Sequence, residues 1–408
     1  MSWPAPGGDG PAGGPAAAGF PIRVTTLELF FDLVFAFTLT QLTALLSGRE
    51  TLTGTVQVLM IFGALWWMYG GYAWLTNTRP PVHAAERLLM LVAMAGFLTA
   101  GLAIPGAFGA DGVAFGLGFL VVTLVHAWLY FRVNANIIRI APFNVASALL
   151  IIAAGLVTSP ARGPGPAGYL LWAVALLVLL GSPLVVHPRG LFELRPAHFV
   201  ERYGALLIVA LGESVAAVGI GAARSGHPDR GTGGTDAISL QLVAAAVLGL
   251  ALAALLWWTI FGDGSDDLAE QVLTASSGQR RVSLALSAYF YGNIPLLLGV
   301  VAIAEGVQQA IARAAGQAAG GATAAAVVLA AGAALFLAGD VTFRRLLRIG
   351  PVAIRAGAAV AAAATVAVGL SVTIEAQLAV VSAVLAVMLA AERFLPGAGR
   401  AAGPVAAG

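Results

Sequence analysis

The chain has 408 residues, of which 59% are hydrophobic and only 10% charged, with a net charge of +2 and a mean hydropathy of +0.91. Soluble domains carry about 25% charged residues, so this composition excludes a water-soluble globular protein and predicts a bundle of membrane-spanning helices. The lack of cysteine excludes disulfides, thiol catalysis and cysteine-ligated metal clusters. All 21 basic residues are scattered arginines, a pattern that excludes no fold but gives no support for nucleic-acid binding.

The two ends of the chain, residues 1–22 and 396–408, are rich in Gly, Pro and Ala. The N-terminal end has neither a basic region nor an apolar core, so we do not expect a signal peptide. We expect both ends to be disordered, because such compositions cannot bury a hydrophobic core.

Between these ends, hydropathy and the charged or Gly/Pro breaks predict twelve membrane-spanning helices of about 20 residues. The first six are expected near residues 27–46, 54–75, 86–107, 112–133, 140–158 and 167–186. The second six are expected near residues 203–223, 238–262, 282–312, 321–341, 352–373 and 376–395. The ninth is long, and Pro295 within it predicts a kink.

The arginines predict the orientation of these spans. With twelve spans, 16 of the 21 arginines fall on the side of the membrane that holds both chain ends, and five fall on the other side. Because cytoplasmic loops carry the excess of Lys and Arg, we expect both termini in the cytoplasm.

Short matching motifs indicate two parallel six-helix repeats, residues 23–200 and 201–395. A Trp-Trp pair ends the second and the eighth span, and Ile-Pro occurs in the third and the ninth. In the same register Glu28 aligns with Glu201, and Thr40-Gln41 with Glu213-Ser214. Repeats of this kind are common in transporters, where the binding site lies between the halves.

Glu28 and Asp32 lie inside the first span, four residues apart on one helix face. A carboxylate in hydrocarbon costs roughly 2.5–3.5 kcal/mol at the helix centre, so acids within spans are functional candidates by default. The alternative for Glu28 is a pairing near the headgroups, either with Arg23 or with an arginine of a neighbouring helix.

Glu213 lies midway along the seventh span, where a buried charge is most costly. We expect it to face a helix–helix contact or a narrow aqueous path, as a proton carrier or as an ionised cation ligand. The structural alternative is a protonated Glu213 that hydrogen-bonds across helices.

Four further positions are weaker candidates. His198 and Glu201 share one face at the start of the seventh span; two ligands are too few for zinc, and an interfacial cap is favoured over a gate. His126 and Asp340 occupy corresponding places in the two halves and could join a proton relay. A neutral His126 bonded to a backbone carbonyl is the favoured interpretation.

Two other features receive structural interpretations. The tryptophan pairs 66–67 and 257–258 are predicted to be anchors at the membrane interface. The acidic run Asp263, Asp266, Asp267 and Glu270 is predicted to be a solvated loop rather than a divalent-cation site.

Five motifs follow one another in a specific order. They are LELFFDLVFA (27–36), WWMY with WLTN (66–69 and 74–77), HAWLY (126–130), HFVERYG with LGES (198–204 and 211–214), and YGNIP (291–295). Together they resemble the bacterial low temperature requirement protein A family over roughly residues 22–395. The resemblance implies a polytopic inner-membrane protein linked by name to growth in the cold, with no settled biochemical activity.

The segment Phe31–Phe37 is also similar to the Phe-Ser-Asp signature in the pore-lining first helix of the lysosomal-type potassium channel family, which repeats six spans as well. Here Phe31 stands where that signature has serine, and the second half has no Phe-x-Asp. This departure argues against a potassium-selective pore.

The sequence therefore predicts an all-α, multi-pass protein of the bacterial inner membrane that moves a small solute or ion with proton or cation coupling. Asp32 and Glu213 are the predicted intramembrane proton or cation sites, and Glu28 and Glu201 the predicted gate charges; the supporting residues are Thr40, Gln41, His126, His198, Ser214 and Asp340. Two alternatives stay open: a cation channel lined by the first and seventh helices, and a membrane-homeostasis or lipid-handling protein without flux.

We find no catalytic signature in the sequence, and we expect neither a cofactor nor a metal. The expected partners are the lipid bilayer and a small solute or cation. A homo-oligomer is compatible with the same pattern.

Overall fold

The computed structural model describes residues 24–48, 52–131, 135–158, 163–186, 194–224, 240–316, 321–350 and 352–394. The described residues form helices joined by turns, and no β-strand occurs among them. The two ends that we expect to be disordered lie outside the described residues.

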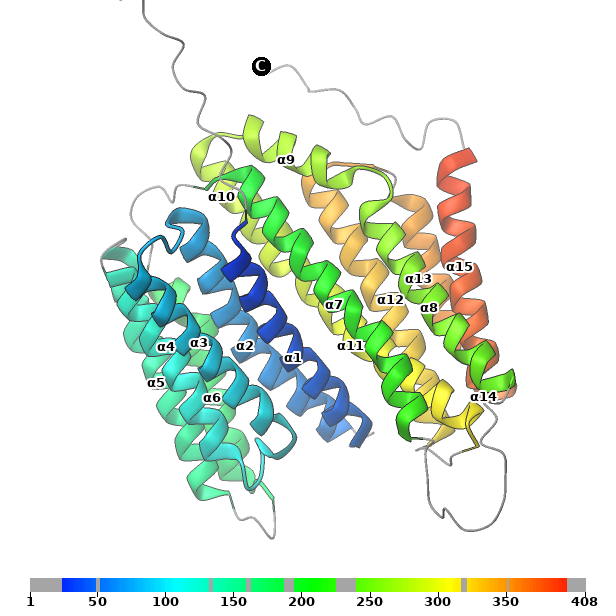
Figure 1. Ribbon diagram of the computed structural model, residues 1–408, viewed down its shortest axis with the longest axis horizontal. Helices are drawn as coiled ribbons and strands as arrows, with labels where there is room; N and C mark the ends of the chain where they lie inside the picture. The colour runs from blue at the N-terminus through cyan, green and yellow to red at the C-terminus, as the bar shows by residue number, and fades with distance from the viewer. Residues whose placement is uncertain are drawn as a thin grey trace, which may run out of the picture.

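The helices follow one another along the chain as labelled in Figure 1. The first part contains α1 (Thr26–Gly48), α2 (Leu52–Thr78), α3 (Ala84–Ala103), η1 (Ile104–Gly106), α4 (Gly112–Phe131), α5 (Ala135–Val157) and α6 (Pro166–Val185). The second part contains α7 (Pro196–Arg224), α8 (Leu240–Phe261), α9 (Ser265–Ala275), α10 (Gly278–Ala285), η2 (Leu286–Tyr291), α11 (Asn293–Ala314), α12 (Ala322–Leu347), α13 (Ala353–Ala364), α14 (Val366–Ser371) and α15 (Ile374–Phe394).

Twelve stretches of helix among the described residues are long and apolar enough to cross a membrane, which confirms the predicted number of spans. Four of them combine consecutive elements: α3 with η1, α8 with α9, α10 with η2 and α11, and α13 with α14.

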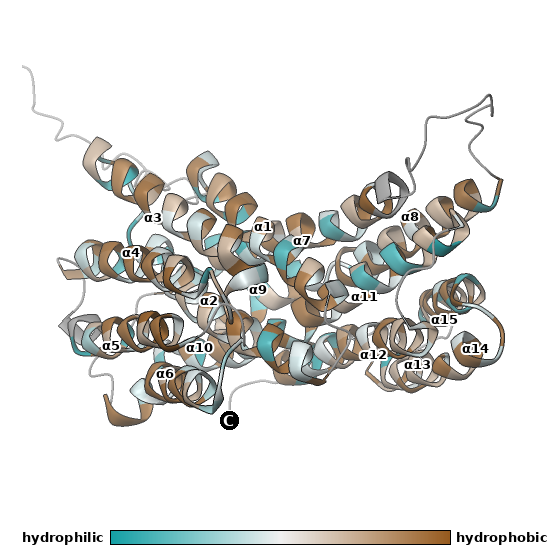
Figure 2. Cartoon of the chain, turned by 90° about the horizontal axis from the view of Figure 1, so that it is seen from below, coloured by the Kyte–Doolittle hydropathy of each residue, from teal (hydrophilic) through white to brown (hydrophobic). Residues whose placement is uncertain are grey.

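The helices are arranged around a central contact between α1 and α7, with α2 and α11 beside them (Figure 1). Helices α3 to α6 pack on one side of this centre, and α8 with α12 to α15 on the other (Figure 2). On each side the neighbours follow in chain order, α3 to α6 and α11 to α13. Two six-helix repeats would produce this order, but the repeat itself stays a prediction. We call the side where α1 begins and α15 ends the terminal side.

The exterior of the bundle is apolar, whereas charged groups lie inside it. Leu102 is 63% exposed, Leu177 is 73% exposed and Val360 is 72% exposed, while Asp32 and Arg202 have no exposed surface. A bilayer favours this arrangement because lipid cannot hydrogen-bond to polar groups. The chain is an integral membrane protein.

The ninth span, Gly278–Ala314, is interrupted by a π-helix rather than by a simple proline kink. This π-helix is η2 at residues 286–291, and Pro295 lies in the first turn of α11, which begins at Asn293. Proline has no N–H to donate to the carbonyl four residues earlier, here that of Tyr291. The missing bond falls where η2 ends, and π-turns are frequent at functional sites.

The acidic run after α8 is not the predicted solvated loop. Residues 265–275 form α9, with Asp266 and Asp267 in its first turn, where the helix dipole favours negative charge. Asp263 precedes this helix, and its Oδ2 lies 2.8 Å from Arg344 Nη1. The loop part of the prediction was wrong because residues 265–275 are helical, while Asp263 and Asp267 are exposed, as a solvated run would be.

Candidate functional site

The start of α1 fixes the position of Glu28. Glu28 Oε2 accepts hydrogen bonds from Thr25 N at 2.8 Å and from Thr25 Oγ1 at 2.9 Å, and Glu28 N donates to Thr25 Oγ1 at 3.3 Å. This reciprocal pairing is a capping box, which satisfies the free N–H groups at a helix start. The second carboxylate oxygen, Oε1, faces α7, and Oε2 also lies 3.3 Å from His198 Nε2 of that helix.

Arg202 of α7 joins the two acids of α1. Its Nη1 lies 2.8 Å from Glu28 Oε1 and 2.9 Å from Thr76 Oγ1 of α2, and its Nη2 lies 3.1 Å from Asp32 Oδ1. Tyr69 of α2 donates to the same Asp32 oxygen at 3.0 Å. Three helices therefore meet at one buried guanidinium.

His198 adds a further contact one turn before Arg202. Its Nε2 lies 3.2 Å from Glu28 Oε1, and its Nδ1 lies 3.3 Å from Asn77 Nδ2. We call these residues the central network: Glu28, Asp32, Tyr69, Thr76, Asn77, His198 and Arg202.

The bonds of Asn77 indicate the tautomer of His198. Asn77 Oδ1 accepts a bond from Arg195 N, and Asn77 Nδ2 donates to Arg195 O, both at 3.0 Å. This pairing fixes the amide so that its NH2 group faces His198 Nδ1, which must then accept. The ring proton is placed on Nε2, where it faces Glu28, and the imidazole is neutral.

Aromatic rings enclose the central network. Arg202 Cζ lies 5.7 Å from the centre of the Phe31 ring and 5.9 Å from that of Tyr69, within the range of a cation–π contact. Further buried rings pack around these two: Phe35, Tyr72, Phe97 and Tyr203. The charges of the network are thereby separated from the lipid.

The central network carries one more negative than positive charge. Glu28 and Asp32 face a single guanidinium, and the tautomer assigned above makes His198 neutral. Asp32 Oδ2 and Arg202 Nε have no hydrogen-bond partner in the described structure. A buried carboxylate oxygen without a partner is costly, so a proton or cation at Asp32 Oδ2 would relieve both the charge excess and the missing bond.

Glu213 makes a second polar contact between α7 and α1. Its Oε2 accepts a hydrogen bond from Thr40 Oγ1, while its Oε1 has no partner among the described residues. Ser214 is buried beside it, and Gln41 is half-buried. The contact lies about 12 Å along α1 from Asp32, for eight residues at 1.5 Å each. The structure therefore places Asp32 and Glu213 in the same helix pair, but in separate hydrogen-bonded groups.

A second group of buried charges lies within the second part of the chain. Arg355 of α13 binds Glu392 of α15 through Nε at 2.7 Å and Nη2 at 2.9 Å, and binds Asp340 of α12 through Nη1 at 2.8 Å. Arg344 binds Asp340 through Nε at 3.0 Å, and its Nη1 reaches Asp263. We call these five residues the peripheral network. It adjoins a cavity of about 600 Å³ on the terminal side.

Three other predicted residues lie elsewhere than expected. Glu201 is exposed and accepts a bond from Val24 N at 3.2 Å, whereas His198 is buried, so the two do not form a joint interfacial cap. Asp340 belongs to the peripheral network and does not contact His126. His126 Nε2 faces the backbone of Gly71, in line with the expected contact to a backbone carbonyl, whereas Nδ1 has no hydrogen-bond partner among the described residues.

The two tryptophan pairs differ from each other. Trp257 and Trp258 are exposed, as interfacial anchors would be. Trp66 is buried and stacks on Tyr69 and Phe290. The anchor interpretation is wrong for Trp66, because α2 lies at the centre of the bundle and turns this side chain inward.

Sequence reasoning offered an arginine of a neighbouring helix as a partner of Glu28, which Arg202 of α7 now supplies, but it did not single out the arginines of either network. It placed Arg202, Arg344 and Arg355 among the loop arginines, yet all three are buried and do not face headgroups. The spacing Thr25-x-x-Glu28 is a readable capping-box signal that was also missed. It would have identified Glu28 as a residue with a second, structural task.

Comparisons with known proteins agree with the motifs. Residues 23–391 match the model of the family described as Bacterial low temperature requirement A protein. An uncharacterized protein of Rhizobium meliloti (strain 1021) is 26% identical over 330 residues, which cover 78% of this chain and 76% of that protein. The family match includes the whole central network.

Proposed function

The chain belongs to the bacterial low temperature requirement A protein family, and we propose that it is a secondary transporter of a small solute or ion. Intramembrane carboxylates couple its movement to protons or cations. The observation that carries this proposal is the buried Asp32 oxygen without a partner, in a network with two carboxylates and one arginine. We further propose that both termini face the cytoplasm of the bacterial inner membrane.

The position of the central network supports coupling between charge and movement. The network connects α1 and α2 to α7, so it spans the contact between the first and second parts of the chain. A proton on Asp32 removes one ionic partner of Arg202 and weakens that contact. A ligand that binds one arrangement of the helices better than another shifts the equilibrium between them.

Glu213 supplies the second contact that alternating access requires. It lies about 16 Å along α7 from Arg202, for eleven residues at 1.5 Å each. The central network therefore holds α1 and α7 together near the terminal side, and the Glu213–Thr40 bond holds them deeper in the bundle. Rocking of one group of helices against the other opens these contacts in turn.

Electrophysiology on a solid-supported membrane tests the proposal with purified protein in liposomes. Separate concentration jumps of H⁺, Na⁺ and K⁺ are applied at zero voltage. We expect transient currents that saturate with one of these ions and that are about tenfold smaller in Asp32→Asn, in line with a typical coupling energy.

Asp267→Asn is the matched control, because Asp267 is an exposed acid on α9; its currents should equal those of the wild type. Sustained currents proportional to the applied voltage, recorded from the same protein in a planar bilayer, would indicate a channel instead of a carrier. A folded protein that gives no current with any of the three ions would refute transport of these ions and favour a role in membrane homeostasis.

A further inference from the structure

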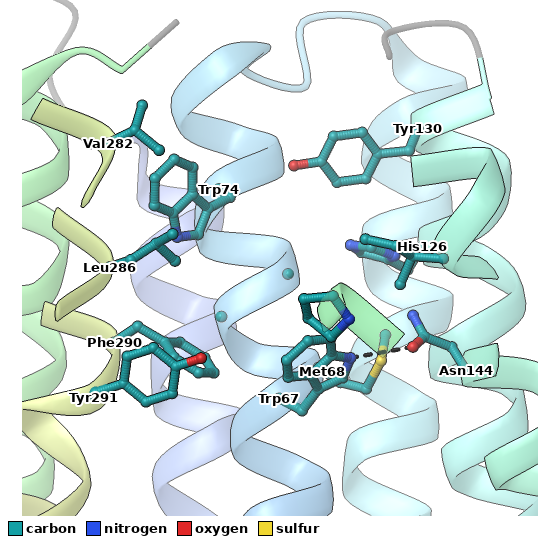
Figure 3. Close-up of a pocket in the computed structure, with 14 residues that line it drawn as sticks. Trp67, Met68, Trp74, His126, Tyr130, Asn144, Val282, Leu286, Phe290 and Tyr291 are labelled. Atoms are coloured by element: carbon teal, nitrogen blue, oxygen red, sulfur yellow. Dashed lines mark hydrogen bonds between the residues drawn. The ribbon is translucent and has the colours of Figure 1, made fainter. Parts of the chain in front are cut away.

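A cavity of about 200 Å³ lies between the first and second parts of the chain, apart from both networks. Its walls come from α2, α4, α5 and α6 on one side and from α10 and η2 on the other (Figure 3). Nothing in the proposed transport cycle uses this cavity, so the inference below does not depend on that proposal.

His126 gives the cavity a polar side chain whose hydrogen bonds are incomplete. The side chain is 5% exposed; Nε2 faces the backbone of Gly71, and Nδ1 lacks a hydrogen-bond partner in the described structure. Figure 3 shows the ring on the α4 side of the cavity, with the hydroxyl of Tyr130 turned toward the same space. A buried donor or acceptor left unmade costs free energy, so a ligand that bonds to His126 would stabilise the protein.

The opposite walls are aromatic and held in place. Trp67 Nε1 donates to Asn144 Oδ1 at 3.1 Å, which fixes the indole at the base of the cavity. Phe290 lies edge-on to Trp67, with ring centres 6.1 Å apart, and stacks on Trp66. Rigid aromatic faces of this kind favour a flat, aromatic ligand, which gains edge and face contacts beyond its buried area.

Two glycines of α2 shape the cavity. A Cβ atom on Gly71 would lie 2.7 Å from His126 Nε2, and one on Gly70 would collide with the Phe290 ring. The Gly70-Gly71 pair thus allows both rings to approach the backbone of α2. A side chain at either glycine would displace one of these rings.

The charge and size of the cavity restrict the ligand further. None of its 14 lining residues is Asp, Glu, Lys or Arg, so a charged ligand would have no counterion. Its volume is of the order that holds a single benzene-sized ring, for which a cavity of about 150 Å³ suffices. Leu286 and Tyr291 are the exposed members of the lining, so the cavity opens past them toward the lipid-facing surface.

We propose that this cavity binds a small, uncharged aromatic molecule with one polar group, such as a phenolic hydroxyl, which hydrogen-bonds to His126. The ligand enters from the lipid phase past Leu286 and Tyr291. A lipid acyl chain is a poorer occupant because it offers no polar group to His126.

Fluorine NMR tests the proposal with the full-length protein in nanodiscs and with empty nanodiscs as the blank. The probes are 4-fluorophenol, fluorobenzene and 4-fluorobenzoate. We expect saturable binding of 4-fluorophenol, about five- to tenfold weaker binding of fluorobenzene, which lacks the hydroxyl, and no binding of 4-fluorobenzoate.

His126→Phe should weaken 4-fluorophenol binding about tenfold and abolish its advantage over fluorobenzene. His83→Phe is the matched control, because His83 lies in an exposed turn before α3, and it should bind as the wild type does. Should His126→Phe not fold, Ile140→Phe fills the cavity from α5 and should abolish binding of both neutral probes.

Two results would overturn the proposal. One is equal binding of 4-fluorophenol to the wild type and to His126→Phe or Ile140→Phe. The other is a signal that rises without saturation and matches that of empty nanodiscs, which would mean partition into lipid only.

Discussion

The central and the peripheral network are built from the same groups, but they differ in completeness. In the peripheral network two arginines bind three carboxylates, and each of its buried side-chain nitrogen and oxygen atoms has a partner in the described structure. In the central network one arginine binds two carboxylates, and Asp32 Oδ2 and Arg202 Nε have none. The first is a finished set of bonds, whereas the second leaves one carboxylate oxygen and one guanidinium nitrogen without a partner.

Access to solvent explains how each network tolerates its charge. Both contain one more acid than arginine. The side chain of Asp263 is 34% exposed and that of Glu392 is 11% exposed, so polar surroundings can compensate the excess in the peripheral network. Glu28 and Asp32 are fully buried, so in the central network only a bound proton or cation can compensate the excess negative charge. The peripheral network is therefore a structural ion network, whereas the central network is a candidate site for binding and release of a proton or cation.

Removal of Arg202 should have the largest effect. Arg202→Met leaves two buried carboxylates without a counterion, and we expect a loss of about 3–5 kcal/mol of stability. The protein is heated in detergent, and the fraction that stays folded at each temperature is measured by size-exclusion chromatography. Arg345→Met is the matched control because Arg345 is exposed on the same terminal side. Equal unfolding temperatures for the two variants would contradict the assigned role of Arg202.

The two neutralised aspartates should differ in the direction that the comparison predicts. Asp340→Asn removes charge-assisted bonds to both Arg344 and Arg355, and should cost about 3 kcal/mol. Asp32→Asn removes the excess charge, keeps the side-chain size, and should change stability by less than about 1 kcal/mol. Thermal unfolding of both variants in the same detergent and buffer compares these two losses of stability. A larger loss in Asp32→Asn would show that the central network is purely structural.

A change from arginine to lysine should show how strongly the peripheral network depends on geometry. Arg355→Lys keeps the charge but loses the paired bonds to Glu392 at 2.7 Å and 2.9 Å. We expect a cost of about 1–2 kcal/mol, since lysine cannot bind a carboxylate as a fork. The same unfolding measurement checks it, and an unchanged midpoint would indicate that charge alone matters at this position.

Glu201 should show the smallest effect on stability. It is exposed, and its single recorded bond is to Val24 N. Glu201→Gln should lie within about 0.5 kcal/mol of the wild type, as exposed substitutions usually do. Currents should also stay at the wild-type level; a selective loss of current at unchanged stability would instead support the predicted gate role.

The parts of the fold that were predictable depend on local sequence. Twelve spans follow from runs of apolar residues, and Asp32 and Glu213 were conspicuous because they interrupt such runs. Arg202 was missed for the converse reason. The polar start of α7 at Pro196 carries no hydropathy signal, so the predicted span began after Arg202, and this residue was counted in a loop.

The sequence by itself determined a membrane protein of twelve helices with acids inside two of its spans, since hydropathy and helical periodicity are properties of neighbouring residues. Only the tertiary structure decided that Glu28 meets Arg202, 174 positions away along the chain, and that Asp32 keeps one oxygen without a partner. The same holds for the aromatic cavity beside His126, which exists only between packed helices. Ionic pairing and enclosed space arise from the distances between helices, and these depend on how whole helix faces fit together.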